Sequence, residues 1–195
     1  HAEAEIVCRK AIDLNPNDGS AYVNLGNALI SQGKHAEAEI VCRKAIDLNP
    51  NDAAAYVNLG NALNGQGKHA EAEAMCRKAI ELNSADANAH FVLGNSLVNQ
   101  GRYAEAEAEY RRVVELNPML SDAYTHLGVA LINQGKHAEA EAMCRKAIEL
   151  NPSDANAHTN LGFALNNQGR YTEAEEKCRK AIELNLSDVN AHVNL

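Results

Sequence analysis

The chain contains 195 residues, of which 46% are hydrophobic, 23% charged and 4% aromatic, and its formal net charge is −8. This composition is too apolar for an intrinsically disordered chain. Acidic and basic residues are interleaved, which disfavours nucleic acid and anionic membrane surfaces as partners. No apolar run approaches the roughly 18 residues that a membrane-spanning helix needs.

The first predicted element is a helix within residues 1–18, and the sequence of this segment recurs unchanged at 35–52. The rest of the chain repeats with a period of 34 residues, as the spacing of one dipeptide shows. This Leu-Gly pair lies at Leu25-Gly26, Leu59-Gly60, Leu93-Gly94, Leu127-Gly128 and Leu161-Gly162. Such a period predicts an array of stacked units rather than one globular core.

Each unit is predicted to form two helices, as the first full unit illustrates. Small and apolar residues recur at helical spacing from Ala21 to Leu29, and Gly33 is a typical left-handed C-terminal cap. A second helix is expected from about Ala36 to Leu48, ended by Pro50, which lacks the N–H that a continuing helix needs. Asp52 can then cap the first helix of the next unit.

This helix pair, with Leu25-Gly26 early, Ala38 and Ala45 in the second helix and Pro50 near the end, resembles the tetratricopeptide repeat. The resemblance implies an all-α fold, a right-handed superhelical solenoid of antiparallel helix pairs whose first helices line a concave wall. It divides the chain into a half repeat (1–18), full repeats at 19–52, 53–86, 87–120, 121–154 and 155–188, and the start of a further repeat at 189–195.

Some positions depart from the pattern. Ser84 and Leu186 stand where the other units have Pro, so the helices before them are expected to run on. His90, His158 and His192 replace a packing aromatic residue of the first helix.

Function is expected on inward-facing residues of the first helices that packing does not require. Many of these are Asn, a mediocre helix former whose amide can pair with the N–H and C=O of an extended peptide. The predicted peptide-contacting residues are Asn24, Asn27, Asn58, Asn61, Asn95, His126, Asn160 and Asn194. This row resembles the asparagine-lined groove of the repeat region in O-linked N-acetylglucosamine transferases.

Alternatives to this reading stay open. The Asn residues could instead be background that duplication copied from unit to unit, which is the less favoured explanation, and His126 either binds an acidic group or is merely solvated. A relative in the family clamps chaperone tails with basic residues at these inner positions. Here the positions hold residues such as Val23, Val57 and Phe91, without Lys or Arg, so this kind of clamp is not expected.

The five cysteines occupy one equivalent position per unit: Cys8, Cys42, Cys76, Cys144 and Cys178. Because stacked units lie about a helix diameter apart, their Cα atoms are expected to exceed the roughly 7 Å limit for a disulfide. The sequence therefore predicts buried, unpaired thiols that act as small hydrophobic side chains. Such thiols suit a reducing cytosol, which favours a cytoplasmic location.

The chain shows no motif that departs from the repeat and carries chemistry. It has no His-Glu-x-x-His or Cys-x-x-Cys motif, and no nucleophile or carboxylate pair outside the repeat. We therefore expect no catalytic residue, no metal site and no cofactor. The recurrent Glu–Arg pairs at i,i+4, such as Glu39–Arg43, are interpreted as a solvated outer surface worth about 0.2–0.5 kcal/mol per pair.

The leading prediction is a non-enzymatic scaffold that binds an extended peptide or partner segment in the concave groove. Apolar residues such as Ile6, Val7 and Ile182 are expected to be exposed at the two ends, so end-to-end association into a homo-oligomer is the first alternative. A longer array, of which this chain is a piece, explains the same exposure. The last alternative is the recruiting arm of a larger enzyme such as a glycosyltransferase.

Overall fold

A computed structural model describes the backbone of residues 2–193 and the side chains of residues 2–185. This part of the chain folds into α-helices without a strand, which confirms the all-α prediction. The helices are α1 (Ala2–Leu14), α2 (Gly19–Ile30), α3 (His35–Leu48), α4 (Ala53–Gly65), α5 (His69–Leu82), α6 (Ala87–Asn99), α7 (Tyr103–Leu116), α8 (Ser121–Asn133), α9 (His137–Leu150), α10 (Ala155–Asn167) and α11 (Tyr171–Val193).

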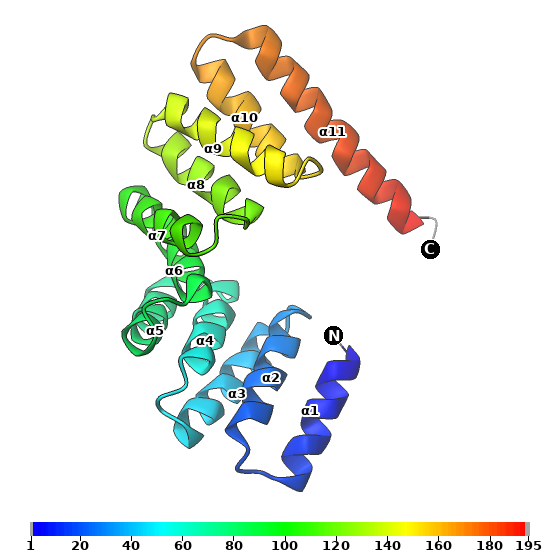
Figure 1. The fold of residues 1–195 in the computed structure, drawn as a ribbon. Coiled ribbons are helices and arrows are strands. Elements are labelled where there is room, and N and C mark those ends of the chain that lie inside the picture. Colours follow the sequence, from blue (N-terminus) through cyan, green and yellow to red (C-terminus); the bar gives the residue numbers. More distant parts are fainter. Residues whose placement is uncertain (1, 194–195) are drawn as a thin grey trace. The chain divides into compact units, whose positions relative to one another are not determined.

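The chain divides into two compact units, which meet between Arg102 and Tyr103 in the sequence. We call α2, α4, α6, α8 and α10 the first helices and the others the second helices. In unit 1, α2 packs on α4 and α4 on α6, while α3 and α5 pack against the first helices on either side of them in the chain (Figure 1). In unit 2, α8 packs on α10, and α7, α9 and α11 lie against these two.

The helix ends follow the predicted signals. Gly33 has a φ of 72°, in the left-handed region that favours glycine, and the Lys34 N–H donates back to the Leu29 carbonyl at 2.9 Å. The Asp52 carboxylate accepts a hydrogen bond of 3.0 Å from the Ala54 N–H at the start of α4. These two interactions satisfy backbone groups that a helix end otherwise leaves unpaired.

The two positions that lack Pro behave differently. The expectation that the helix before Ser84 runs on is wrong, because α5 ends at Leu82 and Asn83 is extended. The Asn83 side chain accepts a hydrogen bond from the Ala85 N–H at 3.2 Å, which forms a turn without Pro. Past Leu186 the helix does run on, so residues 189–193, where we expected a further first helix to begin, continue α11.

The core is built mainly from Ala and Leu side chains, with a buried Cys in several repeats and Tyr110 in the repeat at 87–120. Cys42, Cys76 and Cys144 are fully buried, and burial raises the pKa of the Cys42 thiol to about 12. The five cysteines are free thiols. The prediction that they are all buried is wrong for Cys178, which is exposed, and for Cys8, which is half-buried. These two lie on α11 and α1, which pack against one first helix each, α10 and α2.

In the repeats whose second helix carries a cysteine, the glycine of the Leu-Gly pair lies against the thiol of that helix. A Cβ atom added to Gly60 would lie 2.6 Å from the Cys76 Sγ atom, and the same clash recurs between Gly26 and Cys42. Glycine therefore leaves room for the thiol of the second helix at these positions.

We predict that Gly60→Ala lowers the free energy of unfolding by about 1–3 kcal/mol, because overpacking outweighs the better helix propensity of Ala. Cys76→Ala in the same chain should recover most of this loss, and urea denaturation of the single and double variants measures the coupling. Gly19→Ala is the control, since its nearest contact would be an ordinary 3.7 Å. Strictly additive losses would contradict this packing.

Candidate functional site

The predicted Asn row lies on the first helices, and its members differ in what they contact. Asn24 and Asn27 of α2 and Asn61 of α4 are exposed. The Asn58 side chain instead donates a hydrogen bond of 3.1 Å from Nδ2 to the Val23 carbonyl, which ties α4 to α2. This N–H of Asn58 therefore serves the packing of neighbouring repeats.

The remaining predicted residues are partly covered. Asn95 of α6 and Asn160 of α10 are half-buried. His126 of α8 is half-buried too: its Nδ1 donates to the Asp122 carbonyl at 2.8 Å, and its ring packs tilted on Tyr110 with 5.7 Å between centroids. Asn194 lies outside the described residues.

A cavity of about 660 Å³ in unit 1 brings two of the predicted residues together. Asn24 and Asn27 line it from α2, and Val7 and Cys8 line it from α1. Its wall therefore combines two exposed amides with small apolar groups, and Glu3 of α1 and Ser31 also line it. Such a mixture, apolar with a few convergent polar groups, is typical of ligand-binding cavities.

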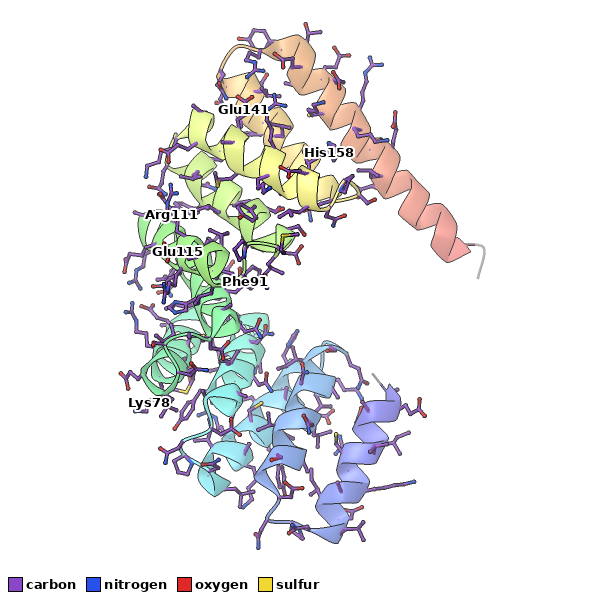
Figure 2. The ribbon with its side chains drawn as sticks, in the orientation of Figure 1. Lys78, Phe91, Arg111, Glu115, Glu141 and His158 are labelled. Atoms are coloured by element: carbon purple, nitrogen blue, oxygen red, sulfur yellow. The ribbon has the colours of Figure 1, made fainter. Side chains whose placement is uncertain are left out.

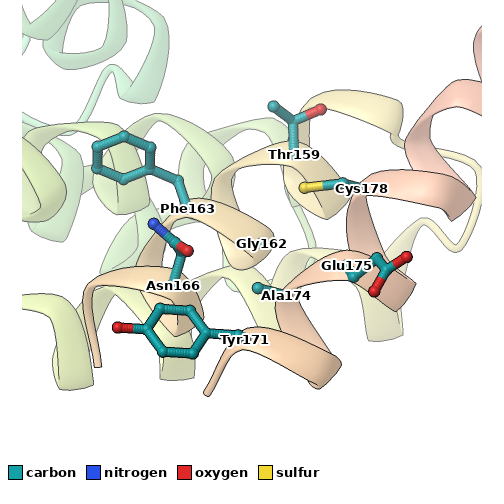
Figure 3. A pocket seen from close by; sticks show the side chains of 8 residues that line it. All are labelled: Thr159, Gly162, Phe163, Asn166, Tyr171, Ala174, Glu175 and Cys178. Atoms are coloured by element: carbon teal, nitrogen blue, oxygen red, sulfur yellow. The ribbon is translucent and has the colours of Figure 1, made fainter. Parts of the chain in front are cut away.

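Unit 2 has a second cavity, of about 360 Å³, between α10 and α11. Figure 3 shows Phe163 and Asn166 of α10 and Tyr171 of α11 along its wall. Phe163 is 52% exposed and Tyr171 is 68% exposed. Neither ring was predicted as a site residue, although Phe163 stands at the position that Asn27 and Asn61 occupy in their repeats.

Comparison with known families decides the fold family. Models of the tetratricopeptide repeat match residues 17–84 and 51–118, and again residues 91–155 and 127–186. The chain belongs to the tetratricopeptide-repeat family. No curated protein matches it.

Several solved structures share the tetratricopeptide-repeat fold of this chain. The crystal structure of YrrB, described as a TPR protein with an unusual peptide-binding site, is 29% identical, covers 91% of each chain and has a TM-score of 0.71. A MamA fragment from Desulfovibrio magneticus RS-1 is 24% identical, covers 87% of this chain and 96% of its own, and has a TM-score of 0.76. Another MamA crystal structure is 24% identical, covers 85% and 97%, and has a TM-score of 0.74.

The predicted replacement of a packing aromatic by His is confirmed where side chains are described. His90 and His158 are 8% and 7% exposed. Each ring places Nε2 3.2 Å from a carbonyl six residues earlier, in Ser84 and Pro152 (Figure 2 labels His158). The Tyr124 hydroxyl makes the equivalent hydrogen bond in its own repeat. His192 lies beyond the described side chains.

The Glu–Arg pairs of the second helices are more than a solvated surface, and that interpretation needs correction. Glu39 accepts hydrogen bonds of 2.8 Å from Arg43 on its own helix and from Gln66 and Lys68 in the turn of the next repeat. We call this arrangement the glutamate clamp. Its equivalents are centred on Glu5, Glu73, Glu107 and Glu141.

The clamp glutamates are well covered, with side-chain exposures of 11–15%. Hydrogen bonds from Lys68, Arg43 and Gln66 lower the pKa of Glu39 to about 2. The recurrence of Gln66 and Lys68 at fixed offsets of 27 and 29 residues from Glu39 was the signal that could have revealed the clamp.

Two kinds of feature are absent from the described residues. No group of three His, Cys, Asp or Glu side chains there could hold a metal ion. None of the helices in that part of the chain combines the length and apolar character that crossing a membrane requires.

Proposed function

We propose that this chain is a protein-interaction scaffold that binds an extended peptide or partner segment along its first helices. The observation that carries the proposal is the cavity of unit 1, where the amides of Asn24 and Asn27 are exposed beside apolar groups of α1. YrrB, which resembles the chain over most of its length, has a peptide-binding site. The backbone of an extended peptide offers the donors and acceptors that such amides complement.

The test uses a random 12-residue peptide library displayed on phage and selected against the whole chain. We predict that Asn27→Ala with Asn61→Ala weakens the binding of the selected peptides by about thirty-fold, since two hydrogen bonds each contribute roughly 1 kcal/mol. Calorimetric titration of synthetic peptides measures the change. The matched control is Asn17→Ala with Asn51→Ala, two exposed asparagines in turns. Equal affinity of both double variants for the peptides would refute the site.

Self-association is the second candidate, favoured by exposed apolar side chains on the second helices. Ile6 and Val7 of α1 are 56% and 61% exposed, and Ile182 of α11 is 58% exposed. The same Asn27→Ala/Asn61→Ala variant separates the two functions, because it should weaken peptide binding and leave light scattering against concentration unchanged.

The narrower parts of the proposal rest on the sequence. The likeness to the asparagine-lined repeats of O-linked N-acetylglucosamine transferases is supported by the exposed Asn24, Asn27 and Asn61 alone. On that likeness the chain would recruit substrates for an enzyme rather than catalyse a reaction. A cytoplasmic location is supported by the five free thiols.

A further inference from the structure

The cavity between α10 and α11 lies where an earlier repeat holds the first helix of the next repeat. Two of its lining residues, Gly162 and Asn166 of α10, stand three repeats after Gly60 and Asn64 of α4. On α4 this face is covered by α6, which packs on both α4 and α5. The described helices that pack on α10 are α8, α9 and α11. The corresponding face of α10 and α11 is therefore exposed.

The contacts that α6 makes on α4 show what this face accepts. Asn64 donates from Nδ2 to the Val92 carbonyl at 3.2 Å and to the Ser96 hydroxyl at 2.8 Å. A Cβ atom added to Gly60 would lie 3.6 Å from the Cγ1 atom of Val92. The amide thus binds the next helix, and the glycine lets a branched side chain of that helix approach. The wall of the cavity in unit 2 presents the same pair of residue types (Figure 3).

Other positions that line the cavity are buried where a further first helix follows. Thr125, one repeat before Thr159, is 5% exposed and donates a hydrogen bond of 2.7 Å to Asp154 at the start of α10. Thr159 itself is exposed. Likewise, Cys144 is buried and Cys178 is exposed. The cavity therefore corresponds to the area that one more first helix would cover.

The glutamate at the clamp position of α11 is bound through one oxygen atom. Glu175 lines the cavity, and among the described residues its partner is Arg179, which donates twice to Oε1, at 3.2 and 2.6 Å. In the clamp of Glu73, Oε2 accepts hydrogen bonds from Gln100 at 2.9 Å and from Arg102 at 2.6 Å. The side chain of Glu175 is 62% exposed, against 13% for Glu73. Its Oε2 atom is therefore accessible to a glutamine and a cation from outside the chain.

We propose that α10 and α11 together bind an amphipathic helix of another protein, whose C-terminal turn carries Gln and, two residues later, Lys or Arg. An apolar face of that helix packs into the cavity, with a branched side chain against Gly162 and a backbone carbonyl on the amide of Asn166. The turn donates to Oε2 of Glu175, and hydrogen bonds between charged groups are the stronger ones. This site is separate from the Asn row and does not depend on the proposed function.

The probe is a fluorescently labelled peptide with the sequence of residues 86–102, which comprises α6 and the turn residues Gln100 and Arg102. Fluorescence anisotropy measures its binding to the whole chain, and we expect saturable binding with one peptide per chain. Glu175→Gln should weaken this binding about ten-fold, because the charged hydrogen bonds of the turn are lost. The matched control is Glu176→Gln, which removes the same charge from an exposed glutamate outside the cavity.

Thr159→Glu tests the helical part of the contact. Because Thr159 is exposed, the fold should tolerate the change, but the new charge would be buried under the bound helix and should weaken binding at least about ten-fold. Thr172→Glu, at an exposed position of α11 outside the cavity, should change affinity less than about two-fold. A peptide with Gln100→Ala and Arg102→Ala should bind the parent about ten-fold more weakly and lose little further affinity for the Glu175→Gln variant.

Each outcome decides the proposal. Weaker binding by Glu175→Gln and Thr159→Glu, with both control variants unchanged, supports it. No saturable binding, or equal affinity of these two variants and the parent, overturns it. A parent chain that sediments as a dimer, and as a monomer with Thr159→Glu, would place a second copy on this face and overturn the assignment to another protein. Asn27→Ala/Asn61→Ala should leave the affinity for this peptide unchanged, so this site and the proposed function can fail separately.

Discussion

Tyr110→Ala is expected to lower the free energy of unfolding by about 3–5 kcal/mol, the usual cost of removing a fully buried aromatic ring. Tyr110 of α7 is 0% exposed and heads the largest fully buried side chains. It stands where the other second helices have the small side chain of Cys, so its surroundings are shaped for a ring and Ala leaves a large cavity. Urea denaturation followed by circular dichroism measures the loss.

The same substitution should loosen His126, because its ring packs against that of Tyr110. Tyr110→Phe is the matched control, since it keeps the ring and should retain most of the stability. Tyr110→Phe should also leave the affinity for the selected peptides unchanged, because it keeps the buried ring. A loss of less than about 1 kcal/mol for Tyr110→Ala would show that the ring is not a main element of the core.

The helix pairs could be predicted from the sequence because their signals are local. Gly33 adopts the left-handed conformation in the turn after α2, and Asp52 caps the first residues of α4. Both residues act within a few residues of their own position. The prediction failed at Ser84, because the absence of Pro there was taken to mean that the preceding helix continues. The side chain of Asn83, one residue earlier, supplies the turn instead.

The candidate site was less predictable, because it depends on how far each helix covers its neighbour. Asn58 and Asn61 are the same residue type on one helix, less than a turn apart. Asn58 reaches the Val23 carbonyl of the adjacent helix, while Asn61 is exposed. Helical periodicity places both on similar faces but does not give the position of the neighbouring backbone. The cavity beside Phe163 was missed for the same reason.

The glutamate clamps lead to a prediction about acid. In Glu39 hydrogen bonds from Lys68 and Arg43 lower the pKa from 4.5 to about 2. In Glu73 burial opposes the change, but hydrogen bonds from Arg102 and Arg77 still lower the pKa to about 2. Between pH values of about 2 and 4.5, the unfolded chain therefore binds more protons than the folded chain. The stability that the clamps contribute is therefore complete above about pH 4.5 and is lost as the pH falls towards 2.

We expect the free energy of unfolding to change little between pH 5 and 7 and to fall steeply between about pH 4.5 and 2. Glu39→Gln with Glu73→Gln should lower stability at pH 7 by about 1 kcal/mol per site, since each loses charged hydrogen bonds. It should also flatten the fall in acid, because two of the groups that take up protons are gone. Urea midpoints measured across this pH range provide both numbers.

Glu81→Gln is the control, because Glu81 is 66% exposed and pairs only at the surface with Lys78. It should change stability by less than about 0.5 kcal/mol at any pH. If the double clamp variant kept the acid profile of the parent, the clamps would contribute no more than this exposed pair. Successive repeats would then be held together by the Ala, Leu and Cys core alone. A flattened profile would instead show that each largely covered clamp glutamate of a second helix fastens the turn that follows in the next repeat.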